Sequence, residues 1–185
     1  MAIRYLVQED IDYSRWDRCI HLSLNSEVYV FSWFLDAIAG TWDALVEDDY
    51  RAVMPLVNKR KFLTKVIYRH PLLNHLGIFS ESPVKADKIM SFLESIPDKF
   101  TKIEICFNRQ NTQALRESFS GCRSVYEMDL IVPYEKKERS YPDEIKNAIG
   151  LAQNRKLSVM KHIALSELES LGWNCYIKMD TRLSY

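Results

Sequence analysis

The sequence predicts an α/β (α+β) protein in which helices flank a mixed, largely antiparallel central sheet. Three observations lead to this prediction. Short apolar alternations with the period of a strand recur along the chain, helical stripes stand between them, and turn-forming residues separate the two. With 185 residues, the chain is long enough for one domain, or one lobe of a larger assembly, with a sizeable core.

The first elements alternate between strand and helix. Residues 3–7 are expected to form a short strand, and a helix is expected to begin near Ser14, three residues before Asp17, in an acidic form of the capping box. A second helix is expected over residues 32–39, because Gly40 is a typical C-terminal stop.

The pattern then changes to the period of a sheet. Residues 42–47 and 51–57 are expected to form a hairpin around an acidic turn. Pro55 cannot donate to a sheet ladder, so we expect an edge, a strand end or a bulge at this position. Further short strands are expected at residues 65–68 and 76–79.

A third helix is expected to begin at Ser82 and Pro83 and to end before Pro97, because a cap residue followed by proline is a common helix start. Residues 101–108 and 124–132 alternate between apolar and polar side chains. This alternation predicts two half-buried strands of an open sheet.

The last third of the chain is expected to extend the first domain. Residues 1–133 are assigned to the α/β lobe, residues 134–140 to a charged connector, and residues 141–185 to a helix-strand extension packed on the same domain. Within this extension the expected elements are helices at 142–155 and 166–171 and strands at 157–160 and 173–179.

Charge and hydropathy exclude several function classes. The 25 Lys and Arg residues balance the 25 Asp and Glu residues, so we expect no broad basic surface for DNA or for an acidic membrane. The N-terminus lacks the apolar core of a signal peptide, and no stretch is apolar enough to span a bilayer. The four scattered cysteines are typical of reduced thiols. We therefore expect a cytoplasmic chain with no membrane insertion.

Motifs for several cofactors and nucleophiles are missing. The five glycines are isolated from one another, so neither a Rossmann fingerprint nor a P-loop is present, and no GxSxG elbow occurs. His70 and His75 lack a third ligand at matching spacing, so no metal site is expected. No intrinsic cofactor is predicted.

Residues 58–61 and Lys65 form the densest basic run in the chain. Arg60 and Lys61 are candidates for binding an anionic group, such as the phosphate of a carrier or an RNA backbone, with Tyr68 or Phe62 available for stacking. The alternative is a solvated hairpin end, which short charge runs usually are.

Trp33 belongs to an aromatic cluster over residues 29–34. It is a further candidate for substrate binding if it lines a cleft, and the alternative is core packing.

Five short phrases, read in order, resemble the N-terminal lobe of bacterial FemAB-like proteins, which have the GNAT-like acyltransferase fold. The likeness covers about residues 1 to 155, and the phrases are WDRCI (16–20), SWFLD (32–36), VMPL (53–56), KRK (59–61) and LGIFS (76–80). The resemblance implies a mixed sheet flanked by helices, one of two such lobes in tandem. It also implies transfer of an acyl or aminoacyl group from a thioester or tRNA carrier to an amine.

The chain departs from this family in its donor-binding half. The family's pyrophosphate loop, Gln/Arg-x-x-Gly-x-Gly/Ala, directly follows a strand and opens a helix. The nearest match is at residues 147–152, with Asn147 in the first position, well inside an expected helix. We interpret this match as chance. The residues that follow are also too few for a second lobe.

These observations predict an acyltransferase-related lobe that is degenerate or depends on a partner for its acyl donor. Acyl-CoA or another acyl carrier would then be a co-substrate. Glu104, His70 and Tyr68 have suitable side chains for a base, but no pattern selects among them, so the catalytic residues are unknown. The alternative is a non-catalytic binding or self-association module of the same fold, working as a homodimer or with a second lobe or partner chain. RNA contact through the basic run is a third hypothesis.

Overall fold

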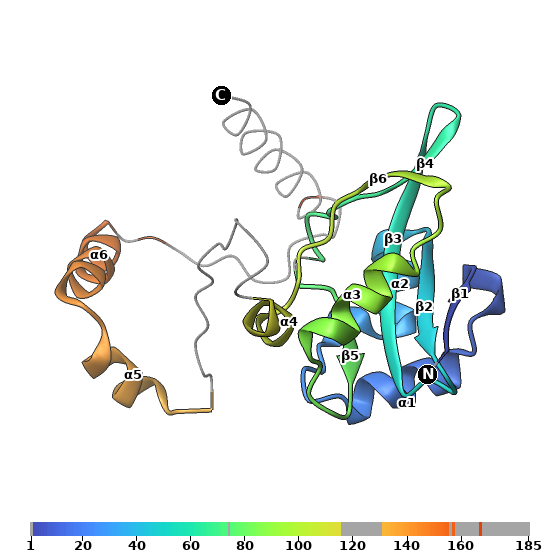
Figure 1. Cartoon of the computed structure of the whole chain (residues 1–185). Helices are drawn as coiled ribbons and strands as arrows, with labels where there is room; N and C mark the ends of the chain where they lie inside the picture. The colour runs from blue at the N-terminus through green and yellow to red at the C-terminus, as the bar shows by residue number, and fades with distance from the viewer. Residues whose placement is uncertain (1, 74, 116–130, 156, 158–166, 168–185) are drawn as a thin grey trace. The chain divides into compact units, whose positions relative to one another are not determined.

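A computed structural model of the chain describes residues 2–73, 75–115, 131–155, 157 and 167. The chain divides into two compact units, Met1–Ser124 and Val125–Tyr185, and each is described by itself. The first unit holds the sheet (Figure 1).

Among the described residues, six strands form the sheet, and their order is β1-β2-β3-β4-β6, with β5 pairing with β3. Every pairing is antiparallel except the parallel one between β4 and β6. The prediction of a mixed, largely antiparallel sheet is therefore confirmed. The strands are β1 (Ile3–Leu6), β2 (Trp42–Glu47), β3 (Ala52–Lys61), β4 (Thr64–Ile67), β5 (Phe79–Ser80) and β6 (Phe100–Ile103).

Helices cover both faces of this sheet (Figure 1). On one face, α1 and α2 pack on one set of β2 and β3 side chains, and on the other face α3 packs on the alternate set. The helices of the first unit are α1 (Tyr13–Leu22), α2 (Ser32–Ala39), α3 (Ala86–Glu94) and α4 (Arg109–Ala114), with short 3-10 turns at Gln8–Asp10 and Val28–Val30.

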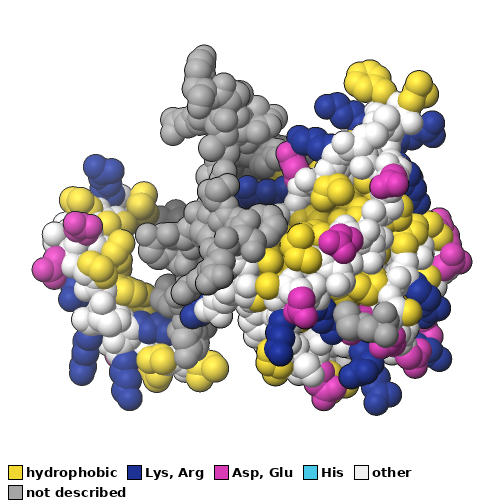
Figure 2. All heavy atoms as spheres, viewed as in Figure 1, with side chains coloured by type: hydrophobic (Ala, Val, Ile, Leu, Met, Phe, Trp, Pro, Cys, Tyr) yellow, Lys and Arg dark blue, Asp and Glu magenta, His cyan; other side chains and the backbone are white. Residues whose placement is uncertain are grey.

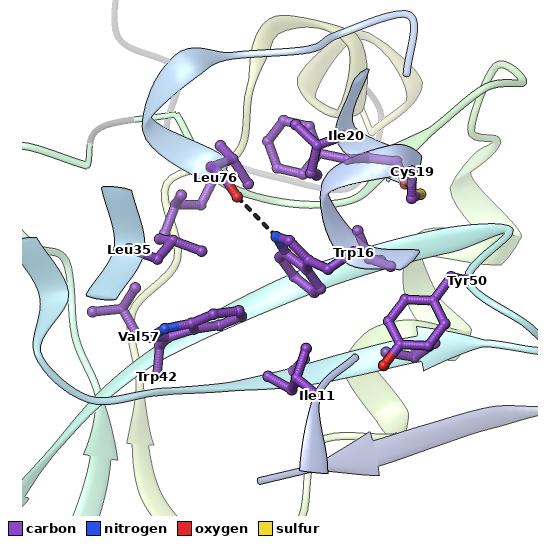
Figure 3. Packing of buried hydrophobic residues seen from close by; sticks show 14 of the residues in the cluster. Ile11, Trp16, Cys19, Ile20, Leu35, Trp42, Tyr50, Val57 and Leu76 are labelled. Carbon is purple, nitrogen blue, oxygen red and sulfur yellow. Dashed lines mark hydrogen bonds between the residues drawn. The ribbon is translucent and has the colours of Figure 1, made fainter. Parts of the chain in front are cut away.

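Two tryptophans form the centre of the core on the α1 and α2 face (Figure 3). Trp16 of α1 and Trp42 of β2 are fully buried, and their ring centroids are 4.9 Å apart. Each indole N–H has an acceptor, since Trp16 donates to the carbonyl of Val30 at 2.9 Å and Trp42 donates to Asp36 at 2.8 Å. Large rings can be buried here because their polar atoms remain hydrogen-bonded.

The cap of α1 differs from the predicted one. Asp12 is the N-cap residue, and its carboxylate accepts the amide of Arg15, whereas Ser14 is exposed inside the helix. Asp17 caps the next helix instead: its two carboxylate oxygens accept the Ser32 amide at 2.7 Å and the Ser32 hydroxyl at 2.8 Å. This side chain therefore joins α1 to the first turn of α2, where the N-cap residue itself provides no side-chain cap.

Pro55 lies where β3 is paired on only one side. Along its other edge β3 pairs with β5 at Ala52 and Val53 and with β4 from Asn58 onward. The predicted local edge is therefore present, and it lies in the middle of the longest strand. At Gly40 a φ of 69° ends α2, as predicted.

Three predicted boundaries are wrong. The strand expected at residues 76–79 is limited to β5 (Phe79–Ser80), and Leu76 forms only an isolated bridge with Phe107. The helix expected at Ser82 begins only at Ala86, because Lys85 before it is still extended, with φ −88° and ψ 163°. The strand expected over residues 101–108 ends at Ile103, and Asn108 caps α4 by accepting the amide of Asn111.

The second unit contains two described helices, α5 (Tyr134–Ser140) and α6 (Asp143–Asn154). The charged segment expected to be a connector is therefore helical, and α6 agrees with the helix expected over residues 142–155. The elements expected at 157–160, 166–171, 173–179 and 124–132 lie outside the described residues except for residues 157, 167, 131 and 132. The predicted division at residues 133 and 140 stays a prediction.

Replacing Asp17 with Ala should lower the free energy of unfolding by about 1–2 kcal/mol, because the first turn of α2 loses its only described side-chain cap. Urea unfolding measures this change. Ser14→Ala is the matched control and should change the stability by less than about 0.5 kcal/mol, since Ser14 is exposed. Equal losses for the two variants would contradict the assignment of the cap.

Candidate functional site

The sheet has a local opening between its two parallel strands. β4 and β6 pair from Lys65 to Ile67, with a register shift after Lys65, and the Glu104 amide still donates to the carbonyl of Ile67 at 3.1 Å. The two segments then separate and meet again at a parallel bridge between Leu76 and Phe107. The chain between Ile67 and Leu76 leaves the sheet, so backbone groups next to the opening need other partners.

Asn111 of α4 supplies those partners at Ile78. Its side-chain oxygen accepts the Ile78 amide at 2.6 Å, and its side-chain nitrogen donates to the Ile78 carbonyl at 3.3 Å. Asn111 is fully buried, and its own amide donates to the side chain of Asn108. One side chain therefore takes the place of a neighbouring strand beside Ile78.

Gly77 makes this close approach possible. Its φ is 111°, and a Cβ placed there would lie 2.3 Å from the side-chain oxygen of Asn111 and 2.9 Å from the ring of Phe107. Only glycine combines this backbone conformation with so little space. The isolated Gly77 was therefore a usable sequence signal, although it gives no information about its partner.

The chain offers no phosphate cradle after β5. Residues 81–85, between β5 and α3, contain no glycine. The weak match at residues 147–152 lies inside α6, as expected, and its amides are part of a helix interior. Neither segment has the geometry of a pyrophosphate loop, which needs amides exposed at the start of a helix.

A polar cluster lies on the α3 face of the sheet, at the side chain of Asp43. Its Oδ2 atom accepts the Tyr5 hydroxyl at 2.5 Å and the Asn58 side-chain nitrogen at 3.0 Å, and the Lys65 ammonium is 3.8 Å away. Asp43 and Asn58 are 2% and 1% exposed. No sequence pattern predicts this cluster, because its members come from four different strands.

Burial and the bond to Asp43 both raise the pKa of Tyr5 above its ordinary value, burial having the larger effect. The phenol therefore acts as a donor to the carboxylate at neutral pH. The Asn58 side-chain oxygen is buried and has no hydrogen-bond partner among the described residues. The cluster is thus polar and nearly closed, a suitable arrangement for holding the edge of the sheet together.

The predicted anion-binding residues do not form one site. Arg60 and Lys61 are exposed neighbours near the end of the β3–β4 hairpin, and strand alternation places them on opposite faces. The ring of Tyr68 is covered by the ammonium of Lys59, 4.1 Å from the ring centroid. Trp33, which is 58% exposed, lies on α2 with its ring 5.4 Å from that of Phe34.

Of the three side chains considered as a base, Tyr68 and His70 are neighbours, and Glu104 is engaged by another residue. The rings of Tyr68 and His70 touch edge to face with centroids 6.0 Å apart. Burial, and to a smaller degree the charge of Lys59, lower the pKa of His70. Glu104 is exposed and pairs with Lys102 at 2.6 Å. No group of three or more potential metal ligands occurs in the described part of the chain.

A surface cavity of about 510 Å³ lies next to α1 and the β2–β3 turn. Burial raises the pKa of the Cys19 thiol at its wall to about 11, so this cysteine is a poor nucleophile. Carboxylates offset part of the positive charge of its three arginines, because Arg15 pairs with Asp12 and Asp49. The lining residues are Arg15, Arg18, Cys19, Leu22, Asp49, Tyr50, Arg51 and Glu81.

Comparison with known proteins does not identify a relative. No family model, no curated protein and no solved structure matches the chain. Among the described residues, no helix has both the length and the apolar character needed to cross a membrane.

Gly77→Ala should lower the free energy of unfolding by about 2–3 kcal/mol, because the new methyl group displaces Asn111 and strains the backbone. Gly150→Ala is the control. Its added Cβ would meet no atom within 4 Å, so the helix should be unchanged or slightly more stable. If Gly77→Ala unfolds at the same urea concentration as wild type, the assigned close contact between Gly77 and Asn111 is wrong.

Tyr5→Phe should make the free energy of unfolding fall less steeply with pH above about pH 10. An unfolded tyrosine ionises near pH 10, whereas the folded chain keeps Tyr5 protonated to higher pH. The stabilising contribution of Tyr5 is therefore complete below about pH 10 and is lost as the pH rises through the raised folded pKa. Urea unfolding across this range should show a steeper decline for wild type than for Tyr5→Phe. Parallel declines would contradict the bond to Asp43.

Proposed function

We propose that this chain is the front lobe of an acyltransferase-related protein of the GNAT/FemAB-like type, and that it depends on a second lobe or a partner chain for its acyl donor. The complete assembly would move an acyl or aminoacyl group from a thioester or tRNA carrier to an amine. Acyl-CoA or another acyl carrier would be the co-substrate, and no residue of this lobe is assigned as catalytic.

The observation that supports the family relation is the opening between β4 and β6. In the GNAT-like fold the carrier enters a V-shaped gap between two parallel strands. Here one pair of strands is parallel, and these two strands separate after Ile67 and Ile103. The alternating order of strands and helices around this pair is also what the resemblance implies.

Dependence on a partner is supported by the hydrogen bonds that already occupy the backbone next to the opening between β4 and β6. Carriers of this kind are held through exposed backbone amides, and at Ile78 both backbone groups are already bonded to Asn111. The segment between β5 and α3 has no glycine for a phosphate cradle. A cytoplasmic location belongs to the same proposal, supported by the unpaired thiols of Cys19 and Cys106.

A second candidate function is self-association without catalysis. It is supported by four exposed apolar side chains along the segment from the end of α1 to the start of α2. Their exposed fractions range from 45% to 58%, and they are Leu22, Leu24, Val28 and Trp33. Exposed apolar residues grouped in this way are typical of a protein interface.

Calorimetric titration of the full chain with acetyl-CoA tests the proposed dependence on a partner. The unmodified chain should give no saturable heat, because Asn111 occupies the backbone groups of Ile78. Saturable binding tighter than about 100 μM would contradict this expectation.

Asn111→Ala is the informative variant, since it frees the Ile78 amide, whereas the Ile78 carbonyl still accepts the Asn25 side-chain nitrogen at 2.9 Å. Weak saturable binding of acetyl-CoA by folded Asn111→Ala, and none by Thr112→Ala on the same helix, is the expected result. If folded Asn111→Ala also fails to bind, the relation to carrier-binding folds loses its main support. Light scattering at high protein concentration then tests the second candidate function, self-association. A monomer at that concentration would exclude it.

A further inference from the structure

The tip of the β3–β4 hairpin carries two apolar side chains that the fold does not use. Phe62 and Leu63 form its two-residue turn, between the paired residues Lys61 and Thr64. They are 90% and 91% exposed. The hairpin projects beyond the other strands in Figure 1, and Figure 2 shows hydrophobic side chains at its end with Lys and Arg side chains behind them.

Turn chemistry does not explain these residues. Phe62 has a φ of 55°, in the left-handed region that glycine and asparagine adopt with little cost. An aromatic residue is unfavourable at this position, and its exposure returns no burial energy. Strained residues of this kind are often found where a protein binds something.

The charge around the tip is mainly positive, and of its four basic residues Lys65 is 3.8 Å from the carboxylate of Asp43. Four of the seven residues from Lys59 to Lys65 are basic and none is acidic, although the whole chain has a formal net charge of zero. Lys59, Arg60 and Lys61 are exposed, and the Lys65 side chain is 41% exposed. This local field attracts an anionic partner even though the average surface does not.

Two carbonyl groups at the turn, those of Lys61 and Phe62, are satisfied by the hairpin's own side chains. Arg60 Nε donates to the carbonyl of Phe62 at 3.3 Å, and the Thr64 hydroxyl donates to the carbonyl of Lys61 at 3.0 Å. An exposed turn in water needs no such bonds. A turn that enters an apolar medium does, because an unsatisfied carbonyl is costly there.

We propose that this hairpin tip docks on an anionic lipid bilayer. Phe62 and Leu63 enter the boundary between headgroups and acyl chains, while the exposed cations of residues 59–61 remain at the level of the lipid phosphates. This is peripheral docking and requires no spanning segment. RNA is the other anionic partner to consider. It could stack on Phe62, but it would make no use of the aliphatic Leu63 or of the satisfied carbonyls.

Vesicle co-sedimentation of the full chain tests the proposal. Wild type should bind vesicles of equal parts phosphatidylcholine and phosphatidylglycerol about tenfold or more tightly than vesicles of phosphatidylcholine alone. Salt should weaken this binding. Phe62→Asn should reduce it about tenfold, and Lys59→Gln or Lys61→Gln about fivefold each. Phe62→Asn should keep or raise the melting temperature, since asparagine tolerates the left-handed φ.

Leu72→Ser is the matched control, because Leu72 is an exposed leucine outside the hairpin, and it should bind as wild type does. Fluorescence anisotropy with a single-stranded oligouridine distinguishes the RNA alternative. Unchanged vesicle binding by Phe62→Asn would overturn the proposal. Absence of vesicle binding would also overturn it, and salt-sensitive oligouridine binding without vesicle binding would do so in favour of RNA.

Discussion

The side chain of Asn111 links two parts of the fold that the sheet leaves apart. Between Ile67 and Leu76 the chain departs from the sheet, and the backbone of Ile78 would have no neighbour on that side. The buried Asn111 side chain accepts the Ile78 amide and donates to the Ile78 carbonyl, which the Asn25 side chain also bonds, and Gly77 provides the space for Asn111. A buried backbone group without a partner is costly, so the path of the chain after β4 depends on this contact.

Strand β3 connects the region around Ile78 and Asn111 to the β3–β4 hairpin. Its first residues pair with β5 beside Ile78, and its last residues form the exposed arm that ends at Phe62. Pro55 interrupts pairing between these two halves on one side only, while β2 continues along the other. One strand therefore has a buried half that is rigidly held and a projecting half that is free to contact a partner.

The elements that the sequence predicted well are those with a local cause. The hairpin of β2 and β3, the glycine stop at Gly40 and the helix α6 follow from periodicity and turn chemistry. The error at the cap of the first helix arises where a distant residue decides, since Asp17 caps Ser32 on another helix and not its own. The same reason kept Asn111 and Asp43 hidden, because their partners are separated from them by 33 and by 15 or more residues.

The amide hydrogen-exchange rate of Ile78 tests the central claim that Asn111 fills the opening in the sheet. The account predicts that this amide is protected as strongly as amides in the β2–β3 ladder, and that folded Asn111→Ala loses the protection at Ile78 while retaining it in that ladder. Exchange of the wild-type Ile78 amide at the rate of an exposed loop would contradict the account.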